Sequence, residues 1–287
     1  MIRDNHVVSG IIPTIGRSTI NLCNAAIEGQ TRPPDEVIVI TDSERRGAGW
    51  ARNEGIRKAR GDLIAFLDDD CIPPKDWLER LISAIDKYDA AGAGGAYKET
   101  DTLFDAQRLR RTIPETEQVD AIGLVGTGGN VMYKRAWLDI LAKKDGYVFN
   151  ESFKSFGSED WELALRLRHR GAKLIFVPNN VCHLRQTTPI RFLCHQFNRG
   201  RGIALLFRAR RSLNTNLTPN KSLIFGDSSS NKISMFFNLF WHKIIGPFDV
   251  MSFNQTREFV MFWIGEKIQV AGFIWEIFLN VRQTKEK

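Results

Sequence analysis

The sequence predicts an α/β protein, with a mainly parallel sheet flanked by helices and a helical C-terminal region. Short apolar runs alternate with helical patterns from residue 7 to residue 178, an order that is typical of parallel sheets. A basic, aromatic segment follows. Ligands of such sheets lie beyond the carboxyl ends of the strands, so the residues that follow each strand are the first candidates for a site.

The expected elements are separated by clear breakers. The strands are residues 7–12, 36–40, 63–67, 92–97 and 173–178, and the helices are residues 18–28, 48–59, 75–88 and 135–142. Pro13 closes the first strand, and Ser18 is a good N-cap for the first helix. Gly47 and Gly61 bracket the second helix, and the proline pair at 73–74 stops the chain before the third.

Composition limits the class of protein. The 287 residues can bury one large α/β core, or a core with a smaller appendage. The four cysteines stand far apart without a Cys-x-x-Cys pair, which argues against a zinc site and a disulfide framework and favours a reducing, cytoplasmic setting. The sequence shows no signal-peptide core and no uncharged apolar run of about 18 residues, so we expect neither secretion by that route nor an integral membrane protein.

The net charge of +7 is unevenly distributed along the chain. Residues 1–184 carry a net charge of −2, whereas residues 185–287 carry +9. A segment as basic as this can attract nucleic acid, anionic lipid headgroups or the phosphates of a substrate.

Three consecutive carboxylates, Asp68, Asp69 and Asp70, follow the apolar strand at 63–67. Residues two apart on a strand share a face, so we expect Asp68 and Asp70 to point together and Asp69 to point away. Two such carboxylates can hold Mg²⁺ or Mn²⁺ together with substrate phosphates. An acidic, solvated strand end is the plainer interpretation of the run taken alone.

A charged segment and a glycine run come next. We interpret residues 98–120 as an excursion over the site. The glycines within 126–129 allow either a close approach of the backbone to a ligand or a bulged strand. The sequence contains neither a Gly-x-x-x-x-Gly-Lys-Ser/Thr motif nor a Gly-x-Ser-x-Gly motif, which excludes a P-loop site and a nucleophile elbow of the usual kind.

Two further clusters carry titratable groups. Ser158 is expected to cap a helix that has Glu159 and Asp160 in its first turn. Acidic residues there complement the helix dipole in any protein, but one of them could also be a general base. His183 and Arg185 lie two apart in an extended stretch, where an imidazole could complete a metal site and a guanidinium could bind phosphate, although a lone histidine is more often structural.

Taken together, these motifs resemble the family 2 glycosyltransferases, which have the nucleotide-sugar-binding fold called GT-A. The resemblance extends over residues 6–210 and follows the family's order, through residues 12–17, 39–43, 49–55, 59–62, 66–70, 129–130, 158–163 and His183. At residues 15–16 the chain has Ile-Gly where many members have an aromatic and a polar residue, and this departure leaves the nucleotide base open.

The resemblance implies a role for each site residue. It implies nucleotide binding by Pro13, Thr14, Arg17, Asp42, Arg52, Asp68 and Asp69, and metal binding by Asp70 and His183. Asp160 is implied as the catalytic base with Glu159 beside it, and Gly129, Asn130, Trp161 and Arg185 are implied as acceptor or phosphate contacts. The implied reaction is an inverting transfer from a nucleoside-diphosphate sugar, with UDP favoured, to a saccharide or lipid-linked hydroxyl in polysaccharide or glycolipid synthesis. The implied cofactor is Mn²⁺ or Mg²⁺.

We expect a catalytic domain at 1–188, a basic helix on the acceptor side at 189–211, a polar linker at 212–231 and amphipathic helices at 232–287. Trp, Phe and Lys occur together in that last region and suit a helix lying in a membrane interface, which predicts a cytoplasmic protein peripheral to the inner face of the membrane. Packing on the catalytic domain or in a homodimer is the alternative. We do not expect nucleic acid as a partner, because the aromatics lie mostly outside the Arg-rich helix.

Two other functions stay open from the sequence. A sugar nucleotidyltransferase would need a Gly-rich, basic phosphate loop after the first strand, and residues 13–17 are a poor one. A non-catalytic binding module at a membrane surface would retain the fold alone, and the presence of Asp70, Asp160 and His183 argues against it.

Overall fold

The computed structural model describes residues 6–100, 114–120, 128–212 and 256–279. The chain divides into two compact units: one of Met1–Thr100, Ile113–Ser155 and Glu159–Arg185, and one of Asp101–Thr112, Phe156–Ser158 and Gln186–Lys287. Residues 213–231 of the expected linker and residues 232–255 of the expected helical region lie outside the described residues.

The first unit contains an eight-stranded sheet. Its order is β2 (Glu36–Thr41), β1 (Val8–Thr14), β3 (Leu63–Leu67), β7 (Asn130–Lys134), β5 (Gly92–Glu99), β8 (Leu174–His183) and β4 (Cys71–Ile72), and β6 (Gln118–Val119) also pairs with β8. β1 runs parallel to β2 and β3, and β5 runs parallel to β8. β7 is antiparallel to both of its neighbours, and β4 and β6 are antiparallel to β8.

The sheet is therefore mixed but mainly parallel, as expected. Because β7 is antiparallel to both β3 and β5, the strands β2, β1, β3, β5 and β8 all run in one direction, and among the described strands β7, β4 and β6 run against them. β7 begins beside the carboxyl end of β3, where Asn130 is the register partner of Leu67.

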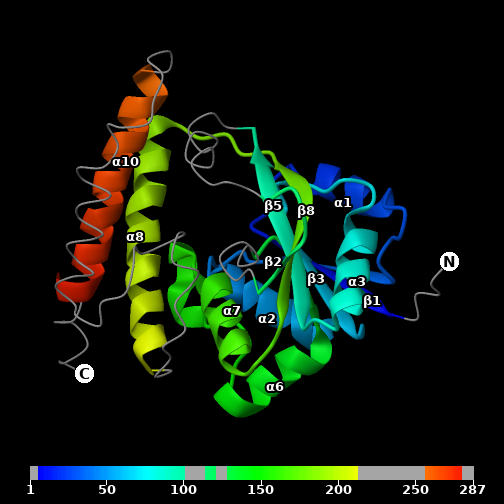
Figure 1. The fold of residues 1–287 in the computed structure, drawn as a ribbon. Helices are drawn as coiled ribbons and strands as arrows, with labels where there is room; N and C mark the ends of the chain where they lie inside the picture. The colour runs from blue at the N-terminus through cyan, green and yellow to red at the C-terminus, as the bar shows by residue number, and fades with distance from the viewer. Residues whose placement is uncertain (1–5, 101–113, 121–127, 213–255, 280–287) are drawn as a thin grey trace. The chain divides into compact units, whose positions relative to one another are not determined.

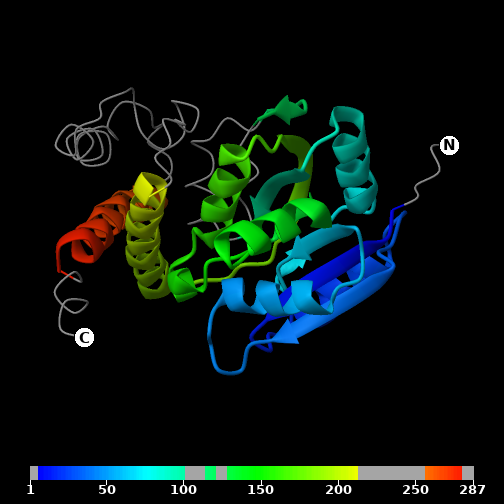
Figure 2. The same cartoon turned by 90° about the horizontal axis from the view of Figure 1, so that it is seen from below.

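Helices cover both faces of the sheet. α1 (Ile20–Glu28) and α3 (Trp77–Tyr88) lie on one side, and α2 (Ala48–Lys58), α6 (Arg135–Asp145) and α7 (Glu159–His169) lie on the other (Figure 1). Figure 2 shows α2 lying along β1 and β2. α1 starts two residues later than expected: Thr19, and not Ser18, precedes it, without a side-chain cap.

The alternation of buried strand residues divides the core into two layers. Leu63, Ala65 and Leu67 pack in the cluster that includes α1 and α3. Phe66 points to the other face, where its ring meets those of Tyr133 and Phe149. A Cβ at Gly55 would overlap the side chain of Ile11, so α2 approaches β1 closely enough to bring its polar residues to the sheet edge.

The second unit contains α8 (Pro189–Ser212), α10 (Thr256–Ile274) and a π-helical turn, η4 (Trp275–Leu279). A Cβ at Gly200 would collide with the backbone of Gln269, and one at Gly272 with the backbone of Phe197, so the two helices pack with their backbones close together. Arg201 binds Glu276 at 2.9 Å. Among the described helices, none combines the length and the apolarity needed to cross a bilayer.

Candidate active site

The three aspartates after β3 do not continue the strand. β3 ends at Leu67, and the backbone N–H of Cys71 donates to the carbonyl of Asp68 at 3.1 Å, which makes a turn. Asp69 and Asp70 both contact Arg17, at 2.6 and 3.1 Å, while Asp68 contacts Arg52 at 3.0 Å. The expected alternation, with Asp68 and Asp70 sharing a face, is therefore wrong, because it assumed an extended backbone.

Thr14 and Arg17 join the end of β1 to this turn. The Thr14 hydroxyl donates to Asp69 at 2.5 Å and accepts the backbone N–H of Gly16 at 2.9 Å. Arg17 is half-exposed, so its guanidinium can reach a ligand as well as the two aspartates. Pro13 is buried within β1. The structure thus brings Thr14, Arg17, Asp69 and Asp70 together at one edge of the sheet.

Asp42 has a different surrounding from the one expected. Its carboxylate is 3% exposed and accepts the backbone N–H groups of Arg46 at 2.9 Å and of Gly47 at 2.7 Å. These bonds anchor the loop between β2 and α2. The expectation that Asp42 binds the nucleotide does not match this geometry, since both carboxylate oxygens already hold the loop.

Arg52 lies inside the protein rather than facing a ligand. It is 3% exposed, with one guanidinium nitrogen 2.6 Å from Glu159 and another 3.0 Å from Asp68. Its guanidinium also lies over the Phe149 ring, 5.5 Å from the centroid. The structure therefore places Arg52 as a bridge between the turn after β3 and the start of α7, in contrast to the expected nucleotide contact.

Asp160 is held by the backbone on both sides of its carboxylate. The N–H of Gly128 donates to one oxygen at 2.8 Å, and the N–H of Trp161 donates to the other at 2.8 Å. The pKa of Asp160 is raised to about 7: burial and, next, the negative charge of Glu159 raise it, while Arg52 and the two N–H groups oppose the shift. A carboxylate with such a pKa is suited to accept a proton near neutral pH. Ser158 precedes α7 with a φ of 78°, which is not the extended backbone of an ordinary N-cap.

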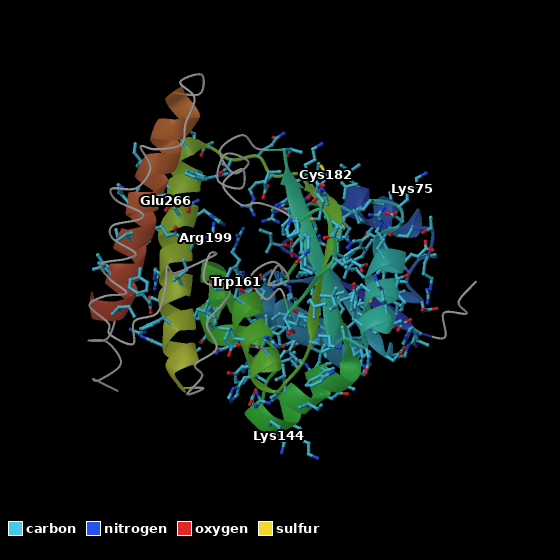
Figure 3. The ribbon with its side chains drawn as sticks, in the orientation of Figure 1. Lys75, Lys144, Trp161, Cys182, Arg199 and Glu266 are labelled. Carbon is cyan, nitrogen blue, oxygen red and sulfur yellow. The ribbon has the colours of Figure 1, made fainter. Side chains whose placement is uncertain are left out.

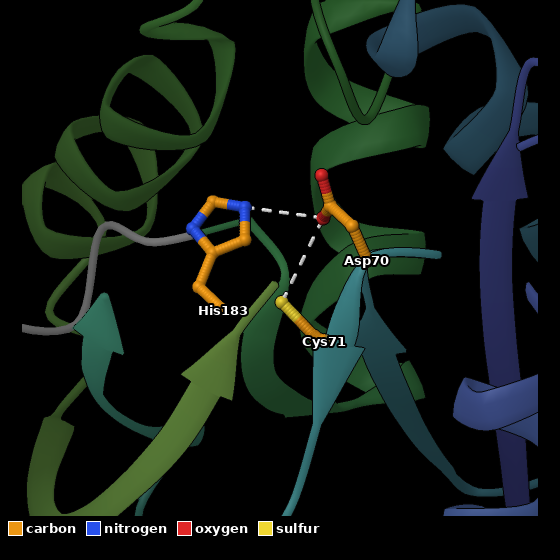
Figure 4. Close-up of side chains that lie close together, drawn as sticks. All are labelled: Asp70, Cys71 and His183. Carbon is orange, nitrogen blue, oxygen red and sulfur yellow. Dashed lines mark hydrogen bonds and ion pairs between the residues drawn. The ribbon is translucent and has the colours of Figure 1, made fainter. Parts of the chain in front are cut away.

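Asp70 and His183 face each other where two paired strands meet: Asp70 directly precedes β4, and His183 is the last residue of β8. The Nε2 atom of His183 lies 3.1 Å from an oxygen of Asp70, and Figure 4 shows the two side chains pointing together beside Cys71. Burial lowers the pKa of His183, but its hydrogen bonds to Asp70 and Glu99 outweigh burial and the pKa is raised. Burial opposes ionisation of Asp70, yet His183 and Arg17 hold the pKa of its carboxyl below the usual value.

This pair fits a divalent cation. Glu99 lies 3.1 Å from Nδ1 of His183, so Nδ1 carries a proton and a neutral imidazole would present a lone pair at Nε2. Two acceptors 3.1 Å apart, Nε2 and the Asp70 oxygen, require a positive charge between them, from a proton or a metal ion. Cys71 lies in the same group, but burial raises the pKa of its thiol well above its usual value, which disfavours the thiolate that a metal needs.

The four expected acceptor or phosphate residues divide into two groups. Asn130 is fully buried: its side-chain oxygen accepts the indole N–H of Trp77 at 2.7 Å and its amide donates to the carbonyl of Ala96 at 2.8 Å. Gly129 has no room for a side chain, since a Cβ there would overlap the carboxylate of Asp68. These contacts make both residues structural supports and contradict a direct ligand role for Asn130.

Trp161 and Arg185 remain accessible. Trp161 is partly buried near the start of α7 (Figure 3). Arg185 is partly buried, and one of its guanidinium nitrogens lies 3.5 Å from Nε2 of His183. The positive charge that a phosphate would need is therefore beside the Asp70–His183 pair.

Sequence reasoning missed Glu99, because residues 98–120 were assigned to an excursion. β5 in fact continues to Glu99, and its last residues pair with the end of β8. The signal that could have found Glu99 is its position at the carboxyl end of a strand that runs parallel to the strand of His183. Gly128 was missed because it contributes a backbone N–H, which no side-chain pattern reveals.

Comparisons with known proteins find similarity in sequence and in fold. Residues 12–141 match the model of glycosyl transferase family 2. The glycosyltransferase AglE of Haloferax volcanii is 39% identical over 100 residues, which are 31% of this chain and 33% of that protein. A glucosyl-dolichyl phosphate glucuronosyltransferase of the same organism is 34% identical over 62 residues, which are 21% of this chain and 20% of that protein. The matched segments thus span a third or less of these relatives.

A solved structure extends the likeness in fold. The mannosyltransferase PcManGT from Pyrobaculum calidifontis, in complex with GDP-Man and Mn²⁺, superposes with a TM-score of 0.62 over 95% of this chain and 87% of that chain, at 13% identity. At this identity the likeness concerns the fold alone, which is the GT-A fold. The family match runs from the end of β1 into α6, on a sheet of that fold, so this part of the chain is similar to glycosyltransferase family 2.

Proposed function

We propose that this protein is an inverting, metal-dependent glycosyltransferase that moves a sugar from a nucleoside-diphosphate sugar to a hydroxyl acceptor. The observation that carries the proposal is the bridge made by Arg52. One buried guanidinium contacts Asp68, in the aspartate motif after β3, and Glu159, next to Asp160. The aspartate motif and the base candidate are thereby held in one rigid group of side chains.

Asp160 acts as the general base in this proposal. Its carboxylate takes the proton of the acceptor hydroxyl, while the acceptor oxygen forms a bond to the anomeric carbon. The bond from that carbon to the diphosphate breaks, and the electron pair leaves with the nucleoside diphosphate. The backbone N–H groups of Gly128 and Trp161 keep the carboxylate oriented, and its raised pKa of about 7 makes it basic enough for this transfer.

Asp70 and His183 are the residues that would hold the metal ion. When bound, the ion would supply Lewis-acid stabilisation of the charge on the leaving diphosphate. An imidazole ligand favours Mn²⁺ over Mg²⁺, which prefers oxygen ligands. Arg17 and Arg185 contact or flank the same pair and are placed to bind phosphate oxygens.

Calorimetric titration with UDP, GDP and dTDP, each with and without Mn²⁺, tests the donor site. We expect one nucleotide, with UDP as the first choice, to bind in a metal-dependent manner, and Asp70→Ala to lose that dependence. The control is Asp76→Ala, which removes a partly exposed carboxylate that pairs with Arg80 at 2.6 Å. No binding of any nucleotide by folded protein contradicts the proposal.

Stereochemistry tests the inverting mechanism separately. With the nucleotide known, its sugars can be screened, and proton NMR of the first product gives the anomeric configuration. A configuration opposite to that of the donor is expected, because one displacement by the acceptor inverts the anomeric carbon. Retention of configuration contradicts Asp160 as the base of a single displacement.

We further propose a saccharide or lipid-linked acceptor, with the protein peripheral to the inner face of the cytoplasmic membrane. The glucuronosyltransferase relative is named for a lipid-linked sugar, glucosyl-dolichyl phosphate. In the second unit, Ile190 is 75% and Trp275 is 47% exposed, and both suit a lipid interface. Sedimentation with anionic and neutral vesicles tests this: binding that Trp275→Ala weakens is expected, and equal recovery in the supernatant with and without vesicles contradicts it.

A further inference from the structure

We propose that Glu99 is the outer carboxylate of the metal centre, a positioning residue that orients the imidazole of His183 and thereby sets the affinity for the metal ion. The inference rests on the proposed function, because it assigns a role at the same Asp70–His183 site. It adds a residue that neither the motifs of the sequence nor the comparisons point to.

Glu99 and His183 are neighbours at the ends of two paired strands. They are register partners of the parallel strands β5 and β8, so their side chains lie on the same face of the sheet. Glu99 is 7% and His183 is 3% exposed. The Nδ1 atom of His183 lies 3.1 Å from one carboxylate oxygen of Glu99 and 3.2 Å from the other. The contact is therefore buried, close and centred on one ring nitrogen.

This contact determines which nitrogen of His183 can bind a metal. A carboxylate next to Nδ1 keeps the proton on that nitrogen, so the lone pair is on Nε2. Nε2 is the atom that faces Asp70, at 3.1 Å. Glu99, His183 and Asp70 thus form a row. Glu99 selects the tautomer of His183, and Asp70 would bind the metal ion together with Nε2 of His183.

A local irregularity of the sheet makes this row possible. Gly94 pairs with Phe176 but Ala96 pairs with Asn180, so β8 contains two more residues than β5 over this stretch. The side chain of Asn179 occupies the space that a Cβ at Gly95 would need. The shift moves His183 into register with Glu99, and without it Glu99 would face Val181.

Backbone contacts hold the row on both sides. The N–H and the hydroxyl of Thr100 donate to the carbonyl of His183 at 3.2 and 3.0 Å. The N–H of Leu184 donates to the carbonyl of Asp70 at 2.7 Å. The Tyr97 ring lies 5.1 Å from that of His183, between centroids. The main chain thus fixes where His183 sits, and Glu99 fixes how its ring is turned.

Metal affinity tests the role of Glu99 without relying on activity. Mn²⁺ alone is titrated into the full chain, and the free ion is measured by its EPR signal. We expect Glu99→Ala to weaken Mn²⁺ binding about 10- to 100-fold, which is the usual effect of removing a residue that hydrogen-bonds a metal ligand. Glu99→Gln is expected to fall between this variant and the wild type, because the amide oxygen can still accept the Nδ1 proton but carries no charge.

A spectroscopic measurement separates positioning from folding. Electron spin-echo modulation of bound Mn²⁺ detects a coordinated imidazole nitrogen; we expect that signal in the wild type and its weakening in Glu99→Ala. Glu28→Gln, which changes an exposed carboxylate on α1, is the matched control and should bind Mn²⁺ as the wild type does. The inference about Glu99 is overturned if folded Glu99→Ala and Glu99→Gln keep the Mn²⁺ affinity and the nitrogen signal of the wild type while His183→Ala loses binding. That result leaves the metal centre itself in place. If His183→Ala and Asp70→Ala both bind Mn²⁺ with the affinity of the wild type, the proposed metal centre is contradicted, and the inference about Glu99 with it.

Discussion

Arg52 and Glu159 form a buried ion pair, with 2.6 Å between the guanidinium nitrogen and the carboxylate oxygen. The two residues are 107 positions apart in the chain, and Arg52 uses a second nitrogen to bind Asp68. A single cation thus neutralises carboxylates from two different motifs. Its removal would leave the buried carboxylate of Glu159 without compensation and the partly exposed Asp68 without this partner, which links the stability of the fold to the geometry of the site.

Arg52→Ala is expected to lower the free energy of unfolding by about 3–5 kcal/mol, the usual effect of breaking a buried ion pair from one side. Urea denaturation followed by circular dichroism measures this change. Arg57→Ala, on the same helix, is the matched control, since its pair with Glu54 is exposed and should contribute no more than about 1 kcal/mol. Equal effects of the two substitutions contradict a bridging role for Arg52.

Asp160→Asn should abolish transfer while leaving donor binding intact. General-base catalysis usually contributes about 10²- to 10⁴-fold, so the activation barrier should rise by about 3–5 kcal/mol. Single-turnover kinetics measures the barrier, and calorimetry with the nucleotide measures binding. Asp139→Asn, at an exposed position of α6, serves as the control. Equal turnover by Asp160→Asn and the wild type removes Asp160 from the role of base.

The rate of transfer should rise with pH through about 7, because burial raises the pKa of Asp160 to about 7 and only the ionised form accepts a proton. The same pKa shift has the opposite effect on stability: its contribution to the free energy of unfolding falls as the pH rises. The folded state keeps the Asp160 proton at pH values where the unfolded state has released it, so this group's stabilising contribution is lost as the pH rises from about 4 to about 7.

A pH series of kcat and of urea midpoints measures both effects, with Asp160→Asn as the reference. The variant should lack this group's contribution to the slope of stability against pH. An identical slope in the variant and the wild type would show that another group titrates.

Removal of metal by EDTA is expected to stop transfer, and Mn²⁺ should restore it more effectively than Mg²⁺ because His183 offers a nitrogen ligand. The activity of the dialysed protein against the concentration of each ion gives the comparison. Full activity in EDTA, with protein shown to be free of metal by elemental analysis, contradicts metal dependence.

Asn130→Ala should destabilise the protein rather than change acceptor binding. The substitution leaves the indole N–H of Trp77 without its partner, and a buried unsatisfied donor costs about 1–3 kcal/mol. We expect this loss in urea denaturation, with kcat and the KM for acceptor within about twofold of wild type. A large increase in the acceptor KM with unchanged stability would return Asn130 to the acceptor site.

Much of the fold could be predicted because its signals are local. The apolar runs at β1, β2 and β3 and the breakers between them identify the elements, and the ends of the strands identify Asp68–Asp70 and His183 as site residues. Residues 98–99 were missed as part of a strand because charged side chains at a strand end look like loop sequence. The face of each aspartate was predicted wrongly because strand alternation was extended into a turn, which begins one residue after Leu67.

The sequence by itself therefore determined the fold class, the resemblance to a family and the residue types of the candidate site, since these follow from the order of short motifs. Only the tertiary structure decided which carboxylate meets which cation. Arg52 meets Glu159 because α2 packs closely on β1, and Glu99 meets His183 because β8 takes two extra residues beside Gly95. Such pairings depend on packing between segments far apart in the chain, and no local pattern of residues specifies them.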